Sequence, residues 1–541
     1  MNLPYEQVPV FTNFANLVDY CASNYGTKCA FKTKDISMSY IEFRDKVAAV
    51  AKVIAKTYTN RRIALIGENS LDWLIVYFAI VLSNNTVIII DREETPEHMK
   101  EMLKTADADT IFASKKHIEK IEELKATKGF IFKKPIETHE FSEILDVKPE
   151  KIKLVSTNPD DAHIIFFTSG TSGPSKAVEL TERSVLYDLY SAASLYRPYG
   201  SVVAFLPFHH AFGLVTAVMK PYYYGAPVYI SGSLKSVAKD IKTHSPQTVF
   251  AVPAVVELFY RQIWREARKS KQELKLKLAL KASKLIPTPI AKFYMEGTDG
   301  TGRNILDSKP VKFRRKLFKS IHASFGNKLE VIICGGAYLD QKYIDFFEAI
   351  GIYILNGYGI TECSPVVAVN RTAMRKRGSV GQIGRGIEIK IASDDEILIK
   401  SPIVMKGYHG NGRETRKALD KGYLHTGDLG YIDEDNYLFI TGRKKDLIIL
   451  SNGENISPES IEKDFLHEKS VRECIVSVEE GQLIAEIFPT EDYLKDQDFF
   501  DKMLYNYNKG RARNKQVALI RLRDEEFPKN NNTKILRRNL K

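Results

Sequence analysis

The chain has 541 residues, 44% of them hydrophobic, and carries a formal net charge of +12 at pH 7. This length is too great for a single compact core, so it predicts two or more domains, and the apolar content excludes a disordered chain. The positive charge favours anionic partners such as nucleotides, anionic cofactors, membrane surfaces or nucleic acid, without choosing among them.

Two features that the sequence lacks indicate where in the cell the protein is located. The five cysteines are scattered and lack the spacing of a zinc site or a disulfide framework, which favours a reducing, cytoplasmic location. The longest apolar run, residues 73–82, is about half of the roughly 20 residues that span a bilayer. The N-terminus also lacks the basic-then-apolar pattern of a signal peptide. We therefore expect a soluble protein.

Short runs of apolar residues recur along the first two thirds of the chain, with helical segments between them. Each run is continuously apolar rather than alternating, which is typical of strands that are covered on both faces in a parallel α/β sheet. We therefore predict two doubly wound parallel-sheet subdomains. The runs are residues 62–66, 87–90, 164–167, 202–206, 227–230 and 331–333.

Much of the positive charge lies in residues 261–284 and 312–319. The content of Lys, Leu and Ala predicts helix over residues 261–284, although the leucines between 274 and 280 alternate with a period of two. Two interpretations of these basic segments stay open. One is a solvated helix face whose lysine stems cover apolar surface. The other is peripheral contact with an anionic membrane, to which Arg314 and Arg315 would contribute.

The pattern changes at about Gly378. Short alternating strands separated by turns follow, as in residues 387–391, 396–399 and 437–440. They predict a small antiparallel, β-barrel-like subdomain that completes a large N-terminal domain of residues 1–442.

Residues 443–541 have helix and strand signals of their own. Ser457 reads as a helix N-cap, and Pro458 as the first residue of the helix. Residues 483–488 read as a strand. We predict a small, mobile α+β domain that follows a hinge.

The most informative segment is TSGTSGPSK, Thr168 to Lys176, directly after the apolar run that ends at Phe167. A strand that ends in such a loop presents backbone N–H groups, hydroxyls and one cation to a single point, which suits a polyphosphate. The spacing differs from GxxxxGK[ST], so a P-loop kinase is disfavoured. Alone, the segment would also be compatible with an ordinary turn.

A second motif is NGYGITE, Asn356 to Glu362, which follows the apolar segment 352–355. We expect a strand that delivers a tight glycine turn bearing an aromatic ring and a carboxylate. Tyr358 could stack on a purine and Glu362 could hold a metal ion. Without other motifs, this segment would read as a surface turn.

Three further segments carry suitable side chains. In GYLHTGDLGYID, Asp428 lies between glycines, where a carboxylate can accept both hydroxyls of a ribose. In GRKKDLIILSNGEN, Arg443 suits phosphate or ribose. In PKNNNTKI, Lys534 lies in a polar loop near the C-terminus, where a basic tail is the simpler interpretation.

Taken in order, these five motifs resemble the acyl-adenylating superfamily of acyl-CoA synthetases, luciferases and peptide-synthetase adenylation domains. The resemblance covers nearly the whole chain, and RRKLFKSIHASFGNKLEVIICGGAYLD is similar to bacterial long-chain fatty acid CoA ligases. It implies ATP, Mg²⁺ and coenzyme A as cofactors, and AMP-forming ligation of a carboxylic acid to a thiol.

The resemblance also implies catalytic roles for Lys534, Thr171, His210 and Glu362. Lys534 would bridge the substrate carboxylate and the α-phosphate. His210, in LPFHHAFG, would border the carboxylate and the incoming thiol, and Glu362 would bind Mg²⁺. The loop implied to cradle the triphosphate consists of Thr168, Ser169, Gly170, Thr171, Ser172, Gly173 and Lys176.

The remaining implied contacts are to the nucleoside and to coenzyme A. Tyr358 would stack on the adenine, and Asp428 and Arg443 would contact the ribose. Lys445 would occupy the hinge, and Gly453 would flank the pantetheine channel. The implied adenine wall and neighbouring motif consist of Gly336, Ala337, Asn356, Gly357, Tyr358, Gly359 and Thr361.

The chemistry explains these residue types. A carboxylate attacks a tetra-anionic triphosphate poorly, so lysine and Mg²⁺ must neutralise charge that builds up on the phosphorus oxygens. The resulting acyl-AMP has a good leaving group, so a thiol can attack its carbonyl and none of the five cysteines is needed. Lys534 must leave before the thiol enters, which a rotating C-terminal domain accomplishes.

We therefore predict an AMP-forming acyl-CoA synthetase, with a long-chain fatty acid as the preferred substrate. Alternatives are an acyl carrier protein as acceptor, or a medium-chain or aryl acid as substrate. A catalytically weakened nucleotide- or lipid-binding homologue also stays open, because Ala177 and Thr533 stand where the family has glycine. Nucleic acid is not expected, because no aromatic-interleaved binding module accompanies the basic segments.

Overall fold

The structure is a computed structural model, and its described residues fall in thirteen stretches. These are residues 8–126, 136–154, 157–168, 175–198, 200–232, 236–286, 303–372, 374–449, 455–479, 482–494, 496–511, 516–529 and 535. Several residues named above lie outside them, so no structural statement applies to those predictions: Ser169, Gly170, Thr171, Ser172, Gly173, Gly453, Thr533 and Lys534.

The N-terminal third forms a largely parallel sheet in the order β18-β8-β7-β4-β3-β5-β6. Its strands are β3 Arg62–Ile66, β4 Thr86–Ile89, β5 Thr110–Ala113, β6 Glu137–Glu140, β7 Ile164–Phe167, β8 Ala177–Leu180 and β18 Gly407–Tyr408. Its helices are α1 Phe14–Tyr25, α2 Tyr40–Thr57, α3 Leu71–Leu82, α4 Pro96–Thr105, α5 Lys115–Ala126 and α6 Phe141–Leu145.

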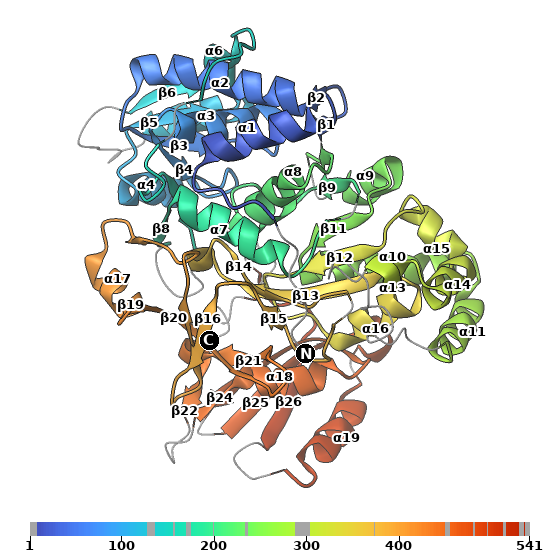
Figure 1. The fold of residues 1–541 in the computed structure, drawn as a ribbon. Coiled ribbons are helices and arrows are strands. Elements are labelled where there is room, and N and C mark those ends of the chain that lie inside the picture. Colours follow the sequence, from blue (N-terminus) through green and yellow to red (C-terminus); the bar gives the residue numbers. More distant parts are fainter. Residues whose placement is uncertain are drawn as a thin grey trace.

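Alternate residues of β3 pack on opposite faces of this sheet. Ile63 and Leu65 join the core that contains α2 and α3, whereas Ala64 and Ile66 join the core that contains α4 and α5. Helices cover both faces (Figure 1), which explains why the strand is continuously apolar. β8 and β18 extend one edge in antiparallel pairing.

The second sheet runs in the order β16-β17-β20-β21-β15-β14-β13-β12-β11-β9-β10-β1-β2. Its parallel part comprises β1 Cys29–Lys32, β9 Val202–Ala204, β10 Val228–Ile230, β11 Thr248–Ala251, β12 Val331–Cys334 and β13 Tyr353–Gly359, with β2 Ser37–Ser39 antiparallel at its edge. The accompanying helices are α7 Glu182–Ala193, the π-helix η1 Phe212–Met219, α8 Lys220–Tyr223, α9 Val237–His244 and α16 Gln341–Ala349.

The antiparallel strands continue this second sheet instead of closing into a separate barrel-like unit. β13 makes the connection, because Tyr353 to Asn356 pair with β12 and Gly357 to Gly359 pair with β14. The antiparallel strands are β14 Val366–Val369, β15 Gly381–Ile383, β16 Glu388–Ile391, β17 Glu396–Lys400, β19 Leu419–Asp420, β20 Tyr423–Ile432 and β21 Tyr437–Arg443, and helix α17 Gly412–Ala418 lies beside them. The predicted α/β class with a small C-terminal region is confirmed.

The C-terminal region packs a small sheet against helices around a core of its own. Its core includes Phe465, Ala485, Ile487 and Phe500. Its elements are β22 Ile448–Ile449, β23 Asn455–Ile456, α18 Pro458–Leu466, β24 Val471–Glu479, β25 Gln482–Pro489, η5 Glu491–Tyr493, α19 Gln497–Asn508 and β26 Val517–Leu522. In Figure 1 this region, in orange and red, lies beneath β21 and β15. The domain boundary after residue 442 stays a prediction.

The basic segment 261–284 forms two helices instead of one. α10 Pro253–Lys269 and α11 Glu273–Lys284 are separated at Lys271, whose φ of 55° is incompatible with a continuous helix. The next helices are α13 Arg303–Leu306, α14 Lys309–Leu317 and α15 Lys319–Ser324.

The proposed contribution of Arg314 and Arg315 to membrane contact is wrong. Arg314 on α14 is buried, and its Nη2 donates to Ile286 O at 2.8 Å. Arg315 donates to Leu329 O at 2.7 Å and to Asn327 O at 2.9 Å. Both guanidiniums therefore hold neighbouring backbone segments; Arg314 is buried away from any lipid, and the partly buried Arg315 is committed to backbone carbonyls. Within the described ranges, every helix falls short of the length and apolarity of a bilayer span.

Candidate functional site

The base of the TSGTSGPSK loop is fixed by strand pairing. β7 and β8 pair antiparallel, with Phe167 opposite Ala177, so the loop connects two adjacent strands. Thr168 N donates to Lys176 O at 3.1 Å and Lys176 N donates to Thr168 Oγ1 at 3.4 Å. Ala177 is buried within β8, where any L-residue adopts the extended backbone, so its replacement of glycine costs no strain there.

Tyr408 contacts both Lys176 and Glu362, the carboxylate of the NGYGITE motif. The Lys176 Nζ lies 4.6 Å from the centre of the Tyr408 ring. The Tyr408 hydroxyl donates to Glu362 Oε1 at 2.9 Å. Burial and the Glu362 carboxylate raise the pKa of Tyr408, so it stays a donor. The loop end and Glu362 thus face one region of the protein.

Lys176 also pairs with Glu414 on α17, at 2.9 Å. Hydrogen bonds from Lys417 and Lys176 lower the pKa of Glu414 to about 2, so this carboxylate is ionised at neutral pH. Sequence reasoning missed both Tyr408 and Glu414. The only local signal was the glycine-rich run GYHGNGRET, which names no partner.

Tyr358, Asp428 and Arg443 form a second cluster from three separate segments. The Tyr358 hydroxyl donates to Asp428 Oδ2 at 2.7 Å, and Arg443 Nε donates to Asp428 Oδ1 at 2.5 Å. Burial and the Asp428 carboxylate raise the pKa of Tyr358 well above its usual value. Burial acts to lower the pKa of Arg443, but Asp428, together with Tyr358 and Asp446, raises it and the net shift is upward. Tyr358 therefore stays neutral and Arg443 stays charged.

Asp428 lies in strand β20 opposite Arg443 of β21 and is only 4% exposed. Each of its oxygens already accepts one hydrogen bond from the protein. A carboxylate has about four acceptor positions, so capacity for hydroxyls remains on the same group.

The predicted glycine turn at NGYG is wrong, because the segment continues strand β13. Gly357 pairs with Val369 and Tyr358 with Ala368 of β14. A Cβ on Gly359 would lie 1.8 Å from Pro365 O, so glycine at this position permits close approach of the backbones. The buried Asn356 Oδ1 has no hydrogen-bond partner among the described residues. Thr361 follows in the 3₁₀ turn η3 Thr361–Cys363, which positions Glu362.

Gly336 and Ala337 follow strand β12 and are both exposed. Gly336 has a φ of 87°, a conformation that favours glycine. Directly before it, a Cβ on Gly335 would lie 3.4 Å from the Phe212 ring. The backbone just before these two residues therefore runs beside η1, while their role as an adenine wall stays a prediction.

His210 lies two residues before η1, with its ring centre 4.3 Å from that of His209. His209 Nε2 lies 3.4 Å from Asp91 Oδ2. Burial, and then the neighbouring His210, lower the pKa of His209 well below its usual value. His210 was predicted from the sequence, whereas its contact with His209 was not. π-helical segments such as η1 are frequent at functional sites.

Ser175, the last residue before Lys176, contacts a histidine that sequence reasoning also missed. Ser175 Oγ lies 3.1 Å from His98 Nε2, and His98 Nδ1 lies 2.6 Å from Glu94 Oε2. A hollow of about 240 Å³ borders this contact. α4 therefore holds one end of the loop.

The region around Arg443 joins the large domain to the C-terminal region. Lys445 is exposed in the 3₁₀ turn η4 Lys444–Asp446, while Lys444 is held by Asp394 at 2.7 Å and by Glu396 at 2.9 Å. Further contacts come from α18, where Lys463 Nζ donates to Ile440 O at 3.0 Å.

The residues present fit a nucleotide with a magnesium ion. Glu362 offers a carboxylate oxygen, the ligand type that Mg²⁺ prefers, and Mg²⁺ needs only one or two carboxylates beside phosphates and water. No cluster of three or more His, Cys, Asp or Glu side chains in the described part of the chain suggests a different, protein-only metal site. Burial raises the pKa of Cys21, Cys334 and Cys363, so these thiols are poor nucleophiles.

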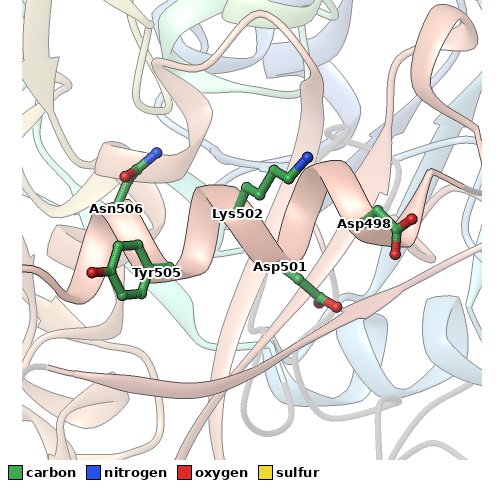
Figure 2. A pocket seen from close by; sticks show the side chains of 5 residues that line it. All are labelled: Asp498, Asp501, Lys502, Tyr505 and Asn506. Atoms are coloured by element: carbon green, nitrogen blue, oxygen red, sulfur yellow. The ribbon is translucent and has the colours of Figure 1, made fainter.

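A larger open depression, of about 540 Å³, lies on α19 in the C-terminal region. Figure 2 shows its side chains along that one helix. They belong to Asp498, Asp501, Lys502, Tyr505 and Asn506. None of them contributes to the clusters above, so the depression is not part of the candidate site.

Comparison with known proteins decides the family. Residues 18–409 match the model of the family described as AMP-binding enzyme. The chain belongs to this family. It is therefore an ATP-dependent, acyl-adenylate-forming ligase of the superfamily that joins acids to coenzyme A or acyl carrier protein.

The relatives of this AMP-binding enzyme are named for different acids and different acceptors. It is 25% identical to the long-chain-fatty-acid–CoA ligase FadD15 of Mycobacterium bovis, over 82% of this chain and 75% of the relative. It is 25% identical to the chloroplastic long-chain-fatty-acid–[acyl-carrier-protein] ligase AEE15 of Arabidopsis thaliana, over 87% and 75%. Its fold matches o-succinylbenzoate CoA synthetase of Bacillus subtilis, solved with its acyl-adenylate intermediate, with a TM-score of 0.73, 20% identity and coverage of 97% and 98%.

Replacing Asp428 with asparagine should raise the KM for ATP about tenfold or more, because the Arg443 guanidinium loses its anionic partner and the cluster loses its fixed geometry. The mutant's KM for ATP and its thermal unfolding midpoint are measured together. Asp435→Asn is the matched control, since Asp435 is exposed and pairs only with Lys376 in the described contacts. An unchanged KM in Asp428→Asn would contradict the role of the cluster.

Proposed function

We propose that this AMP-binding enzyme activates a long-chain fatty acid with ATP and transfers the acyl group to coenzyme A. The observation that carries the proposal is the arrangement of the two clusters. Tyr358 of the Asp428–Arg443 cluster and Glu362 of the Tyr408–Lys176 cluster are four residues apart along the chain. A nucleotide with its ribose at the first cluster and its phosphates at the second would span them.

In the first step, a carboxylate oxygen of the acid attacks the α-phosphorus, the bond to the bridging oxygen breaks, and pyrophosphate leaves. Lys176 and the loop 168–176 would hold the β- and γ-phosphates, and Lys534 would neutralise charge between the carboxylate and the α-phosphate. Mg²⁺, bound through Glu362, would supply further neutralisation of phosphate charge. The ionised Glu414 would release Lys176 to the phosphates when the nucleotide enters.

In the second step, the thiol sulfur of coenzyme A attacks the acyl carbonyl carbon. The carbon–oxygen bond to phosphate breaks, AMP leaves, and the thiol proton passes to solvent or to a nearby base. His210 would border this reaction, and Gly453 would flank the thiol's approach. Rotation of the C-terminal region about Lys445 would move Lys534 out of the active site and bring in the surface that contains Gly453. We propose residues 1–442 and 443–541 as the two bodies that move.

The proposal also names the acid substrate and the thiol acceptor, and the relatives support each choice to a different degree. Relatives named for long-chain fatty acids support that substrate. A relative named for acyl carrier protein as acceptor favours a second candidate, in which an acidic carrier replaces coenzyme A. The exposed lysines of this positively charged chain would suit such a carrier.

The test is pyrophosphate release across saturated acids of graded length and aryl acids, each with coenzyme A, with holo-acyl carrier protein, or with neither. The proposal expects the highest kcat/KM with long chains and rapid turnover only with coenzyme A. Highest activity with an aryl or medium-chain acid would refute the substrate. Turnover only with the carrier would refute the acceptor, and absence of acid-dependent pyrophosphate release would refute adenylation.

A further inference from the structure

Helix α11 presents two apolar faces, and within the described part of the chain only one of them packs against the core. Leu276 is buried and Leu280 packs against the core, whereas Leu274 is 71%, Leu278 57% and Leu285 85% exposed. At about 100° per residue, the three exposed leucines fall within about 40° of one another, opposite the buried face. This arrangement also explains the period-two alternation of leucines in the sequence.

Helix α14 repeats the pattern next to the end of α11. Phe313 is 58% and Leu317 42% exposed, four residues apart, while Val311 is buried on the other side. The bond from Arg314 to Ile286 O, 2.8 Å long, joins α14 to the residue that follows the exposed Leu285. Figure 1 shows both helices at one edge of the molecule. We define the docking face as Leu274, Leu278, Leu285, Phe313 and Leu317 with the surrounding lysines of α11 and α14.

The lysines make this face strongly positive. α11 and α14 contain Glu273 as their only acidic residue. All the lysines of the two helices are exposed, and Lys281 lies within the leucine stripe. They are Lys275, Lys277, Lys281, Lys284, Lys309, Lys312 and Lys316.

We propose that the docking face binds the surface of an anionic membrane. A solvated lysine face accounts for the charges but not for aliphatic and aromatic side chains held outward on two adjoining helices. Outward apolar residues ringed by lysine are the composition by which interfacial helices bind anionic lipid, with the apolar side chains below the headgroups and the lysine ammoniums among them. Exposed lysines accompany these apolar side chains on both helices, and Glu273 is the only acid there, so charge complementarity favours an anionic lipid surface as the occupant.

The proposal concerns binding and does not depend on which acid the active site uses. Arg314 and Arg315 are left out of the docking face because they donate to backbone carbonyls, so the variants change only exposed residues. The purified full-length chain is sedimented with phosphatidylcholine vesicles that contain or lack phosphatidylserine. We expect the chain to sediment with the anionic vesicles only, and high salt to weaken the binding.

The apolar variant is Leu274→Ser with Leu278→Ser and Phe313→Ser, and the charge variant is Lys281→Glu with Lys316→Glu. Each should lower the vesicle partition coefficient about tenfold or more. The matched controls are Leu494→Ser and Lys148→Glu with Lys151→Glu, which change exposed residues elsewhere and should bind like the wild type. Circular dichroism and thermal unfolding establish that every variant is folded.

Three results would overturn the proposal. One is a wild-type chain that does not sediment with anionic vesicles. Another is a concentration-dependent doubling of mass in light scattering that the apolar variant abolishes while vesicle binding is unchanged, which would assign the face to a second copy of the chain. The third is binding of holo-acyl carrier protein that the variants abolish without affecting vesicle binding.

Discussion

Replacing Glu362 with glutamine should slow acyl-AMP formation by about 100-fold or more, because the variant loses the anionic ligand for Mg²⁺ next to the phosphates. Glutamine has nearly the same shape, and its carbonyl can still accept the Tyr408 hydroxyl that now lies 2.9 Å from Glu362 Oε1. The substitution therefore removes charge while it preserves the local contact. The measurement is acid-dependent exchange of labelled pyrophosphate into ATP at several magnesium concentrations.

Tyr408→Phe separates the charge from the hydrogen bond. It removes the donor to Glu362 but leaves the carboxylate and the ring beside Lys176. We expect an effect of about tenfold or less, with most of it in the KM for magnesium–ATP. Exchange in Glu362→Gln at the wild-type rate and with unchanged magnesium dependence would contradict the assignment of Glu362.

Lys534→Ala should reduce acyl-AMP formation by about 1,000-fold while thioester formation from supplied acyl-AMP stays within about threefold of the wild type. The lysine itself lies outside the described residues, but Lys529 and Ile535 lie within them. Lys529 forms a bridge with Ile535, which packs against Ile475, Phe488 and Phe527. Loss of the side chain should therefore leave the C-terminal core intact.

The two half-reactions are measured separately, by pyrophosphate exchange and by thioester formation from synthetic acyl-AMP with coenzyme A. Lys502→Ala is the matched control, since Lys502 lies on α19 of the same region and lines the open depression of Figure 2. It should change neither step. Equal loss of both steps in Lys534→Ala would refute a role confined to adenylation.

The strands of the parallel sheets could be predicted because burial on both faces requires a local run of apolar residues. After Arg62, residues 63–66 are continuously apolar since helices cover both faces, and β3 occupies the predicted run 62–66. The glycine run at Asn356 to Gly359 misled the prediction, because glycine favours a turn locally while pairing with β14 extends the strand. Long-range pairing outweighed local propensity there.

The contacts of the candidate site could not be predicted from the motifs alone. Lys176 and Glu414 are 238 residues apart, and neither segment carries a signal for the other. Tyr408 lies 46 residues from Glu362 and reaches it because β18 extends the edge of the first sheet beside β8. Likewise, the sequence predicted Arg314 as a surface charge, whereas the orientation of α14 buries its side chain. Such contacts depend on the packing of elements that are distant in sequence.

The central claim is that the acid is activated as an acyl-AMP held by the two clusters. The most direct measurement uses a fatty acid labelled with ¹⁸O in its carboxylate, with ATP and coenzyme A, and mass analysis of the AMP produced. If the carboxylate attacks the α-phosphorus and the thiol then displaces AMP, each AMP retains an oxygen from the acid. AMP without label, or label found in inorganic phosphate beside ADP, would contradict the claim.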